Sequence, residues 1–268
     1  MHPVLVDISE SIKIYSFGTF IVLAFLVASW YARRRAAKQL GLDKERVFSV
    51  CFTLLFIGLL GARMAYVFLK YEEFAARPMS FLEIWNGGLV WYGGLIACLL
   101  WLSWYLPRKP EMKGWAFLDV LAIAACLAIL VGRQASFLSG ENYGKIAPDL
   151  AWAVTFPPVA YTQVPGSHIG QPLHPTQLYH ALHGLVLFGI LLLVAKRKPG
   201  AGALTGLFLV LYAIGRAVIE IWRDDDVARG MVFGGRVSTS QLISIPVFFL
   251  GLALLLSRWH KRGAAQAA

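Results

Sequence analysis

Seven long apolar segments, separated by shorter charged or glycine-rich stretches, divide the 268-residue chain. Each is long enough to cross a hydrocarbon layer about 30 Å thick when it rises about 1.5 Å per residue as a helix. A helix forms the hydrogen bonds of its backbone internally, and this is necessary because lipid tails offer no donors or acceptors. The sequence therefore predicts an all-α integral membrane protein, a single domain over residues 1–268 built as a bundle of seven transmembrane helices. The predicted spans are 14–32, 47–69, 88–106, 115–138, 174–195, 203–222 and 238–257.

Composition supports a membrane protein and argues against several other classes. Hydrophobic residues make up 58% of the chain and the mean hydropathy is +0.62, too apolar for an ordinary soluble domain. Cys51, Cys98 and Cys126 all lie in apolar segments without metal-ligand spacing. Neither a disulfide framework nor a metal site is expected, and we expect no cofactor.

The distribution of basic residues predicts the orientation of the spans. Fifteen lysines and arginines follow the odd-numbered spans, whereas seven lie on the other side and three lie within spans. Because basic residues accumulate in cytoplasmic loops, the N-terminus is predicted outside and the C-terminus in the cytoplasm. The net charge of +10 then indicates contact with anionic lipid, and nucleic acid is not an expected partner. The fifteen are Arg33, Arg34, Arg35, Lys38, Lys44, Arg46, Arg108, Lys109, Lys113, Lys196, Arg197, Lys198, Arg258, Lys261 and Arg262.

Three arginines within the spans point to an anion site. Arg63, Arg133 and Arg216 all fall in the outer part of their predicted helices, with Glu220 one turn beyond Arg216. An ionised group near the bilayer centre costs at least about 2.5 kcal/mol and usually serves an ion or a substrate. Guanidinium groups suit phosphate, so a phospholipid headgroup of the outer leaflet is the predicted partner. The alternative is that these residues form structural salt bridges only.

Other polar features have simpler structural interpretations. His180 and His183 lack a third ligand at suitable spacing, so we expect satisfied interhelical histidines. The tract 224–226 of three aspartates is expected to be a solvated external loop. Gly93 and Gly94 are expected to serve close helix packing.

The segment that follows the fourth apolar run resembles a known family signature. Gly132-Arg133-x-Ala135-Ser136-Phe137-Leu138-Ser139-x-Glu141-x-x-Gly144 is similar to the signature of bacterial prolipoprotein diacylglyceryl transferases. Further matches follow the family's order along essentially the whole chain. They are the segments 61–66, 84–88, 174–179, 215–220 and 240–244. The family also has seven spans and an external N-terminus, and here a long external loop covers 139–173.

This resemblance implies transfer of the sn-1,2-diacylglyceryl group from phosphatidylglycerol to a cysteine thiol. The acceptor would be the lipobox cysteine of preprolipoprotein signal peptides, in the first step of lipoprotein maturation. It also implies a multi-pass protein of the bacterial cytoplasmic (inner) membrane whose active site faces the outer leaflet. Arg133 and Arg216 would bind the phosphate, Glu141 and Glu220 would orient them, and His174 is the candidate thiol base. The expected substrate-binding residues are Arg63, Tyr66, Tyr92, Ser136, Gly144 and Gln177.

The chain departs from the family pattern at a few positions. Ser136 and Ser139 replace asparagines, Phe17 replaces a tyrosine and Tyr92 replaces a histidine. A second hypothesis is therefore a catalytically weakened or inactive paralogue that binds phospholipid or lipoprotein. An unrelated transporter or seven-helix receptor is disfavoured. The polar residues lie away from the midplane, no internal repeat is found, and the last span, 238–257, has no lysine for a Schiff base.

If these departures have lowered the rate, restoring the family residues should raise it. We expect the combined variant Phe17→Tyr, Ser136→Asn and Tyr92→His to transfer diacylglyceryl groups faster than the parent chain. The reason is that each change returns a hydroxyl, an amide or an imidazole with its own hydrogen-bonding capacity. The measurement is the initial rate of lipid transfer to a lipobox peptide. An unchanged rate would show that the departures are neutral.

Overall fold

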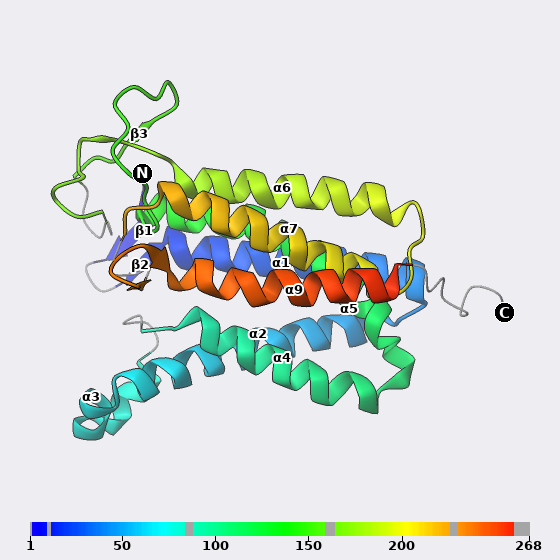
Figure 1. The fold of residues 1–268 in the computed structure, drawn as a ribbon. Coiled ribbons are helices and arrows are strands. Elements are labelled where there is room, and N and C mark those ends of the chain that lie inside the picture. The colour runs from blue at the N-terminus through cyan, green and yellow to red at the C-terminus, as the bar shows by residue number, and fades with distance from the viewer. Residues whose placement is uncertain (1, 10–11, 84–87, 159–163, 226–229, 260–268) are drawn as a thin grey trace. The chain divides into compact units, whose positions relative to one another are not determined.

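The computed structural model describes residues 2–9, 12–83, 88–158, 164–225 and 230–259 and is predominantly helical (Figure 1). Its long helices are α1 (Ser16–Leu40), α2 (Lys44–Leu69), α4 (Trp91–Arg108), α5 (Gly114–Ser139), α6 (Thr176–Ala195), α7 (Ala203–Ile219) and α9 (Thr239–Arg258). Shorter helical turns are α3 (Tyr71–Ala76), η1 (Pro78–Leu82), η3 (Pro110–Met112) and η4 (Glu220–Trp222). Three antiparallel strand pairs are β1 (Val4–Ser9) with β2 (Ile12–Tyr15), β3 (Val154–Thr155) with β4 (Pro172–Leu173), and β5 (Met231–Val232) with β6 (Val237–Ser238).

The predicted all-α membrane class is confirmed for six helices. Six helices in the described part of the chain are long and apolar enough to cross a membrane: α1, α2, α5, α6, α9 and the stretch Ala203–Trp222 formed by α7 and η4. The predicted span 88–106 forms α4, which is not among the six, so the seventh crossing and the orientation stay predictions. The first helix also continues past its predicted end at residue 32 to Leu40, because its arginines, alanines and lysine favour helix.

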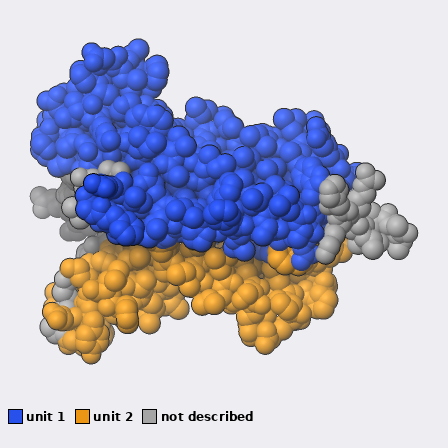
Figure 2. All heavy atoms as spheres, viewed as in Figure 1, with its two compact units in different colours: residues 1–28, 118–268 blue, residues 29–117 orange. Residues whose placement is uncertain are grey.

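The chain forms two compact units, which we describe separately (Figure 2). Unit 1 comprises residues 1–28 and 118–268, and unit 2 comprises residues 29–117. In unit 1, α6, α7 and α9 lie side by side, and the loop that carries β3 lies near the start of α6 (Figure 1).

Small residues allow α7 and α9 to approach closely in unit 1. A Cβ atom added to Gly206 would lie 2.9 Å from the carbonyl oxygen of Gly251, and the reverse distance is also 2.9 Å. Such close backbone contact is a main source of helix association in lipid, where no hydrophobic force acts between helices. Gln241 adds a polar contact, because its Nε2 atom donates to the carbonyl of Ala217 at 3.4 Å.

The side chain of Asp119 caps the N-terminus of α7. Its carboxylate accepts hydrogen bonds from the backbone nitrogens of Gly202 (2.8 Å) and Thr205 (2.7 Å) and from the Thr205 hydroxyl (2.7 Å). These donors lie at the N-terminus of α7, where backbone N–H groups have no helical partner. The Asp119 carboxylate of α5 therefore provides the hydrogen-bond acceptor for the first N–H groups of α7. This contact gives Asp119, an ionisable residue in an apolar segment, a structural role.

Unit 2 is held together by an equally close pair, α2 and α4. A Cβ atom on Gly93 would lie 2.5 Å from the carbonyl oxygen of Gly61, and one on Gly94 would lie 2.6 Å from that of Gly58. Cys98 also donates its thiol to the carbonyl of Leu54 at 3.3 Å. The prediction that the Gly93–Gly94 pair serves helix packing is confirmed.

This contact makes the stability of unit 2 sensitive to a single methyl group. We expect Gly93→Ala to destabilise the protein by about 1–3 kcal/mol, because the added Cβ atom would lie 2.3 Å from that of Ala65. The matched control is Gly189→Ala in α6, where an added Cβ atom meets nothing within 4 Å. The measurement is thermal unfolding in detergent, and equal midpoints for the two variants would contradict the packing argument.

Candidate active site

A buried carboxylate organises the charged groups at the end of α7. The Glu220 side chain has no exposed surface and accepts a hydrogen bond from Nη1 of Arg216 and another from Nη1 of Arg223 at 3.1 Å. Arg216 also donates through Nη2 to the hydroxyl of Ser240 on α9 at 2.6 Å. The predicted pairing of Arg216 with Glu220 is confirmed, and Glu220 proves to be shared by two cations.

The aspartate tract contributes to this network, so the prediction of a solvated loop is wrong for Asp225. Asp225 is buried and accepts from Nε and Nη2 of Arg223 at 2.9 and 2.5 Å. Burial acts to lower the pKa of Arg223, but the ion pairs with Asp225 and Glu220 outweigh it and raise that pKa. Asp224 binds Nε2 of His168 at 2.9 Å. A buried arginine requires such compensation. Asp226 lies outside the described residues.

Backbone pairing fixes the loop that follows α5 against this network. The nitrogen of Lys145 donates to the carbonyl of Trp222 at 2.8 Å, and its own carbonyl accepts from the nitrogen of His174 at 2.9 Å. Gly144 lies between the backbone segments around Trp222 and His174, where an added Cβ atom would lie 2.4 Å from the carbonyl oxygen of His174. Gly144 is therefore required by close backbone approach, while its predicted contact with substrate stays a prediction.

Glu141 and Gln177 meet at the start of the same loop. Nε2 of Gln177 donates to the main-chain oxygen of Glu141 at 2.7 Å, and the Thr176 hydroxyl donates to that of Asn142. Burial raises the pKa of Glu141, against the lowering effect of Arg133. The α6 helix thus holds the loop backbone in place and leaves the Glu141 carboxyl close enough to Arg133 for an electrostatic interaction.

Arg133 is the cation with open donors. It is half-buried near the end of α5 and interacts electrostatically with Arg216, Arg223, Asp225 and Tyr212. Within the described ranges, however, its guanidinium makes no hydrogen bond and no ion pair within 4 Å. Two neighbouring guanidiniums raise the positive potential further. The arrangement suits an anion that binds Arg133 and the exposed part of Arg216.

His174 lies beside the loop in an aromatic cluster. Its Nδ1 atom is 3.0 Å from the hydroxyl of Tyr179, which also accepts from the indole nitrogen of Trp152 at 3.0 Å. Partial burial, and then the charge of Lys145, lowers the pKa of His174. The imidazole is therefore neutral near pH 7, as a proton acceptor must be.

Three buried polar atoms in this region have no hydrogen-bond partner among the described residues. They are Oε1 of Gln177, Nε2 of His180 and Nδ1 of His183. The prediction of satisfied histidines is therefore wrong for one nitrogen of each, although Nε2 of His183 does approach the carbonyl of Leu211 at 3.2 Å. The described residues also contain no group of three His, Cys, Asp or Glu side chains that could hold a metal ion.

The end of α5 contains the two serines that depart from the family pattern. Ser136 and Ser139 are both buried, and the Ser139 hydroxyl donates to the carbonyl of Ser136 at 3.3 Å. The same carbonyl accepts from the nitrogen of Gly140 at 3.0 Å. Ser139 therefore helps to terminate the helix that carries Arg133, while a contact of Ser136 with substrate stays a prediction.

Arg63 has a different environment in unit 2. Its guanidinium donates to the carbonyls of Phe81 (2.9 Å), Ser80 (2.5 Å) and Gly88 (3.1 Å) and lies over the rings of Tyr66 and Phe74. It therefore organises the loop between α3 and α4.

Tyr92, in the first turn of α4, packs edge-on against Trp91. Substrate contacts of Arg63, Tyr66 and Tyr92, and the meeting of Arg63 with the other two arginines, stay predictions.

Sequence reasoning missed the roles of Arg223 and Asp225. Arg223 is one of the seven external basic residues, and the sequence also places it at i+7 from Arg216, but no pairing with Glu220 or Asp225 is predicted from this spacing. It lies three residues after Glu220 and seven after Arg216, so all three share one helical face. The bidentate pairing with Asp225 depends on a turn after η4 and has no such periodicity.

The buried carboxylate makes the network sensitive to loss of one charge. We expect Glu220→Gln to destabilise the protein by about 3–5 kcal/mol, because it leaves Arg216 and Arg223 without their shared counter-ion. Asp149→Asn removes a carboxylate from an exposed loop position and serves as the control. Thermal unfolding in detergent is the measurement, and equal midpoints would refute the counter-ion role.

Comparisons with known proteins agree over nearly the whole chain. The model of the family described as "Prolipoprotein diacylglyceryl transferase" matches residues 3–257. A relative from Geobacter sulfurreducens is 34% identical over 247 residues, covering 90% of this chain and 90% of that protein. Relatives from Vibrio vulnificus (34%, covering 99% of this chain and 94% of that protein) and Rhodospirillum centenum (35%, covering 96% and 91%) are equally similar.

All three relatives are named phosphatidylglycerol--prolipoprotein diacylglyceryl transferase. The matched region contains Arg133, Glu141, His174, Arg216 and Glu220. With the family model matching most of its length, the chain belongs to the prolipoprotein diacylglyceryl transferase family.

Proposed function

We propose that this protein transfers the sn-1,2-diacylglyceryl group of phosphatidylglycerol to a cysteine thiol of a prolipoprotein. The observation that carries the proposal is the open guanidinium of Arg133 beside the Arg216–Glu220–Arg223 network. Such a site is built to hold a phosphate, and the family relatives carry the name of this transferase.

The reaction places negative charge where the arginines lie. The acceptor thiolate attacks C3 of the diacylglyceryl group, a carbon–sulfur bond forms, and the bond between C3 and the phosphate oxygen breaks. Glycerol phosphate then leaves with the bonding electron pair. Arg133 and Arg216 stabilise the charge that develops on the phosphate, and Arg216 needs no reorganisation because Glu220 and Ser240 already hold it.

The proton of the acceptor thiol needs a base, because the thiolate is the nucleophile and a free cysteine has a pKa near 8.5. His174 is the proposed base. Its imidazole is neutral near pH 7, is partly exposed, and belongs to the backbone pairing that fixes the loop carrying Glu141. Glu141 would orient Arg133, since the two groups interact electrostatically.

The proposal also covers the substrate contacts and the membrane topology. Arg63, Tyr66, Tyr92, Ser136, Gly144 and Gln177 would contact the two substrates, and the acceptor would be the lipobox cysteine of a signal peptide. The Gln177 Oε1 atom is a buried acceptor without a partner in the described residues, which suits a hydroxyl of the lipid headgroup. Seven spans, an external N-terminus and an outer-leaflet site in the bacterial inner membrane agree with the charge distribution.

No observation favours the inactive paralogue. The charged site of unit 1 retains all five residues proposed to be catalytic, and the relatives reported above are named as the enzyme.

Loss of Arg133 should abolish most of the activity without preventing folding. We expect Arg133→Ala to lower the rate of transfer by about 10²–10³, the usual effect of removing one prepositioned donor to a developing anion. Arg236→Ala removes an exposed arginine and should retain the parent rate. The measurement is transfer of labelled diacylglyceryl groups from phosphatidylglycerol to a lipobox peptide by purified protein.

Complementation of a transferase-depleted bacterium gives the independent check. The parent chain and Arg236→Ala should restore the lipoprotein mass shift, and Arg133→Ala should not. Parent-level transfer by Arg133→Ala would overturn the phosphate assignment. Failure of the parent chain despite normal membrane insertion would overturn the proposed function.

A further inference from the structure

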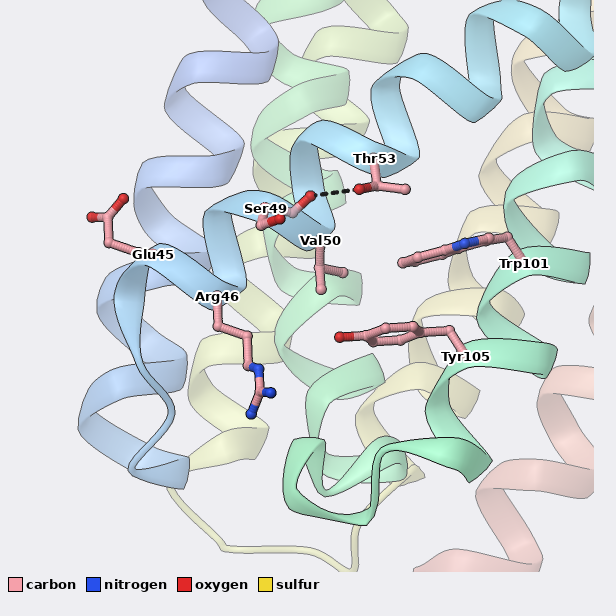
Figure 3. Close-up of a pocket in the computed structure, with 7 residues that line it drawn as sticks. All are labelled: Glu45, Arg46, Ser49, Val50, Thr53, Trp101 and Tyr105. Atoms are coloured by element: carbon pink, nitrogen blue, oxygen red, sulfur yellow. Dashed lines mark hydrogen bonds between the residues drawn. The ribbon is translucent and has the colours of Figure 1, made fainter.

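A polar pocket lies within unit 2, between the first turns of α2 and the last turns of α4 (Figure 3). Its volume is about 380 Å³. It is lined by Glu45, Arg46, Ser49, Val50, Thr53, Trp101 and Tyr105. Arg46 precedes Arg63 by 17 residues on the same helix, which corresponds to about 25 Å at about 1.5 Å per residue. The pocket is thus separate from the predicted headgroup contacts of Arg63.

The pocket presents hydrogen-bond donors that have no protein acceptor. The Ser49 hydroxyl, the Trp101 indole N–H and the Tyr105 hydroxyl make no hydrogen bond within the described part of the chain. The rings of Trp101 and Tyr105 stack with centroids 4.5 Å apart and point from α4 toward α2 (Figure 3). Together with the Arg46 guanidinium, these donors suit a ligand rich in acceptor oxygens.

The charge balance at this end of unit 2 favours an anion. Arg33 pairs with Glu45, and Glu45 points away from the rings of Trp101 and Tyr105 (Figure 3). Arg46 pairs with Glu111 at 3.2 Å. The second pair is open to solvent, since 45% of each side chain is exposed, so Arg46 keeps donors for a ligand. Residues 33–46 and 108–113 together hold nine lysines and arginines and three carboxylates. The excess positive potential attracts anions to this end.

Apolar surface continues from the pocket along both helices. Phe52 and Phe56 of α2 and Leu100 and Trp104 of α4 are all exposed, in the turns that include and follow the pocket toward the helix centres. A free phosphate would gain nothing from this surface, whereas acyl chains would cover it. Aromatic residues near a helix end also mark the level of the lipid headgroups.

We propose that this pocket binds the phosphate headgroup of an anionic glycerophospholipid whose acyl chains lie along Phe52, Phe56 and Leu100. Arg46 binds the phosphate, and Ser49 and Tyr105 donate to its oxygens or to the glycerol esters. By the distribution of basic residues, this lipid belongs to the leaflet opposite the substrate, so it is a bound structural lipid and not a donor of diacylglyceryl groups.

Native mass spectrometry of the full chain in detergent tests the proposal. Dioleoylphosphatidylglycerol and dioleoylphosphatidylcholine are titrated against the parent chain and against Arg46→Gln, Ser49→Phe and Arg108→Gln. The last variant is the matched control, because Arg108 lies at the same end but outside the pocket. We expect the parent chain and the control to retain one more anionic lipid than the two pocket variants. Arg46→Gln should bind that lipid about fivefold more weakly, the change expected from one basic residue near anionic headgroups.

Each other outcome overturns the proposal. Equal retention of phosphatidylglycerol by the parent chain, Arg46→Gln and Ser49→Phe would show that the pocket holds no lipid. Equal losses in Arg46→Gln and Arg108→Gln would indicate non-specific attraction to the basic end. Equal retention of phosphatidylcholine would exclude anion selectivity, and displacement of the lipid by millimolar inorganic phosphate would identify a simple anion site. Transfer activity with saturating phosphatidylglycerol stays at the parent level in both pocket variants, which separates this site from the proposed active site.

Discussion

The charged site of unit 1 depends on one buried carboxylate, that of Glu220. Without it, Arg216 and Arg223 would be two buried like charges on one helical face, a costly arrangement at membrane depth. With it, Arg216 is held in one orientation and Arg223 is directed to Asp225. Arg133 lies beside these paired charges without an ion pair of its own in the described residues. A cation with open donors beside such a network can stabilise a departing phosphate.

The loop after α5 connects this field to the proposed proton acceptor. Backbone pairing joins Lys145 to Trp222 on one side and to His174 on the other, and Gly144 allows the three segments to come this close. Hydrogen bonds between main-chain atoms thus fix three parts relative to one another. They are the proposed base His174, the loop after Glu141, and the turn η4 that follows α7. Backbone hydrogen bonds position these segments, and the serines at 136 and 139 lie within the helix that precedes this pairing.

The charged groups of the two units differ in burial and in pairing. In the charged site of unit 1 the cations are few: Arg216 and Arg223 pair with carboxylates, whereas half-buried Arg133 has no ion pair in the described residues. At the basic end of unit 2 they are numerous and exposed, and they leave Arg46 beside a pocket with open donors. Lipid phosphate is the proposed ligand at both places, with a reaction proposed at the first and binding alone at the second.

Periodicity and charge counting were sufficient for the helices, for the pairing of Arg216 with Glu220 and for the packing role of Gly93, because all of these depend on local spacing. The family motif also predicts a site role for Arg133, which stays a prediction. Only the tertiary structure revealed the pairing of Arg223 with Asp225, the His168–Asp224 contact and the capping of α7 by Asp119. Each of these joins segments through a turn or across helices. Such contacts follow from how the chain folds back on itself, which hydrophobic spacing along one helix does not encode.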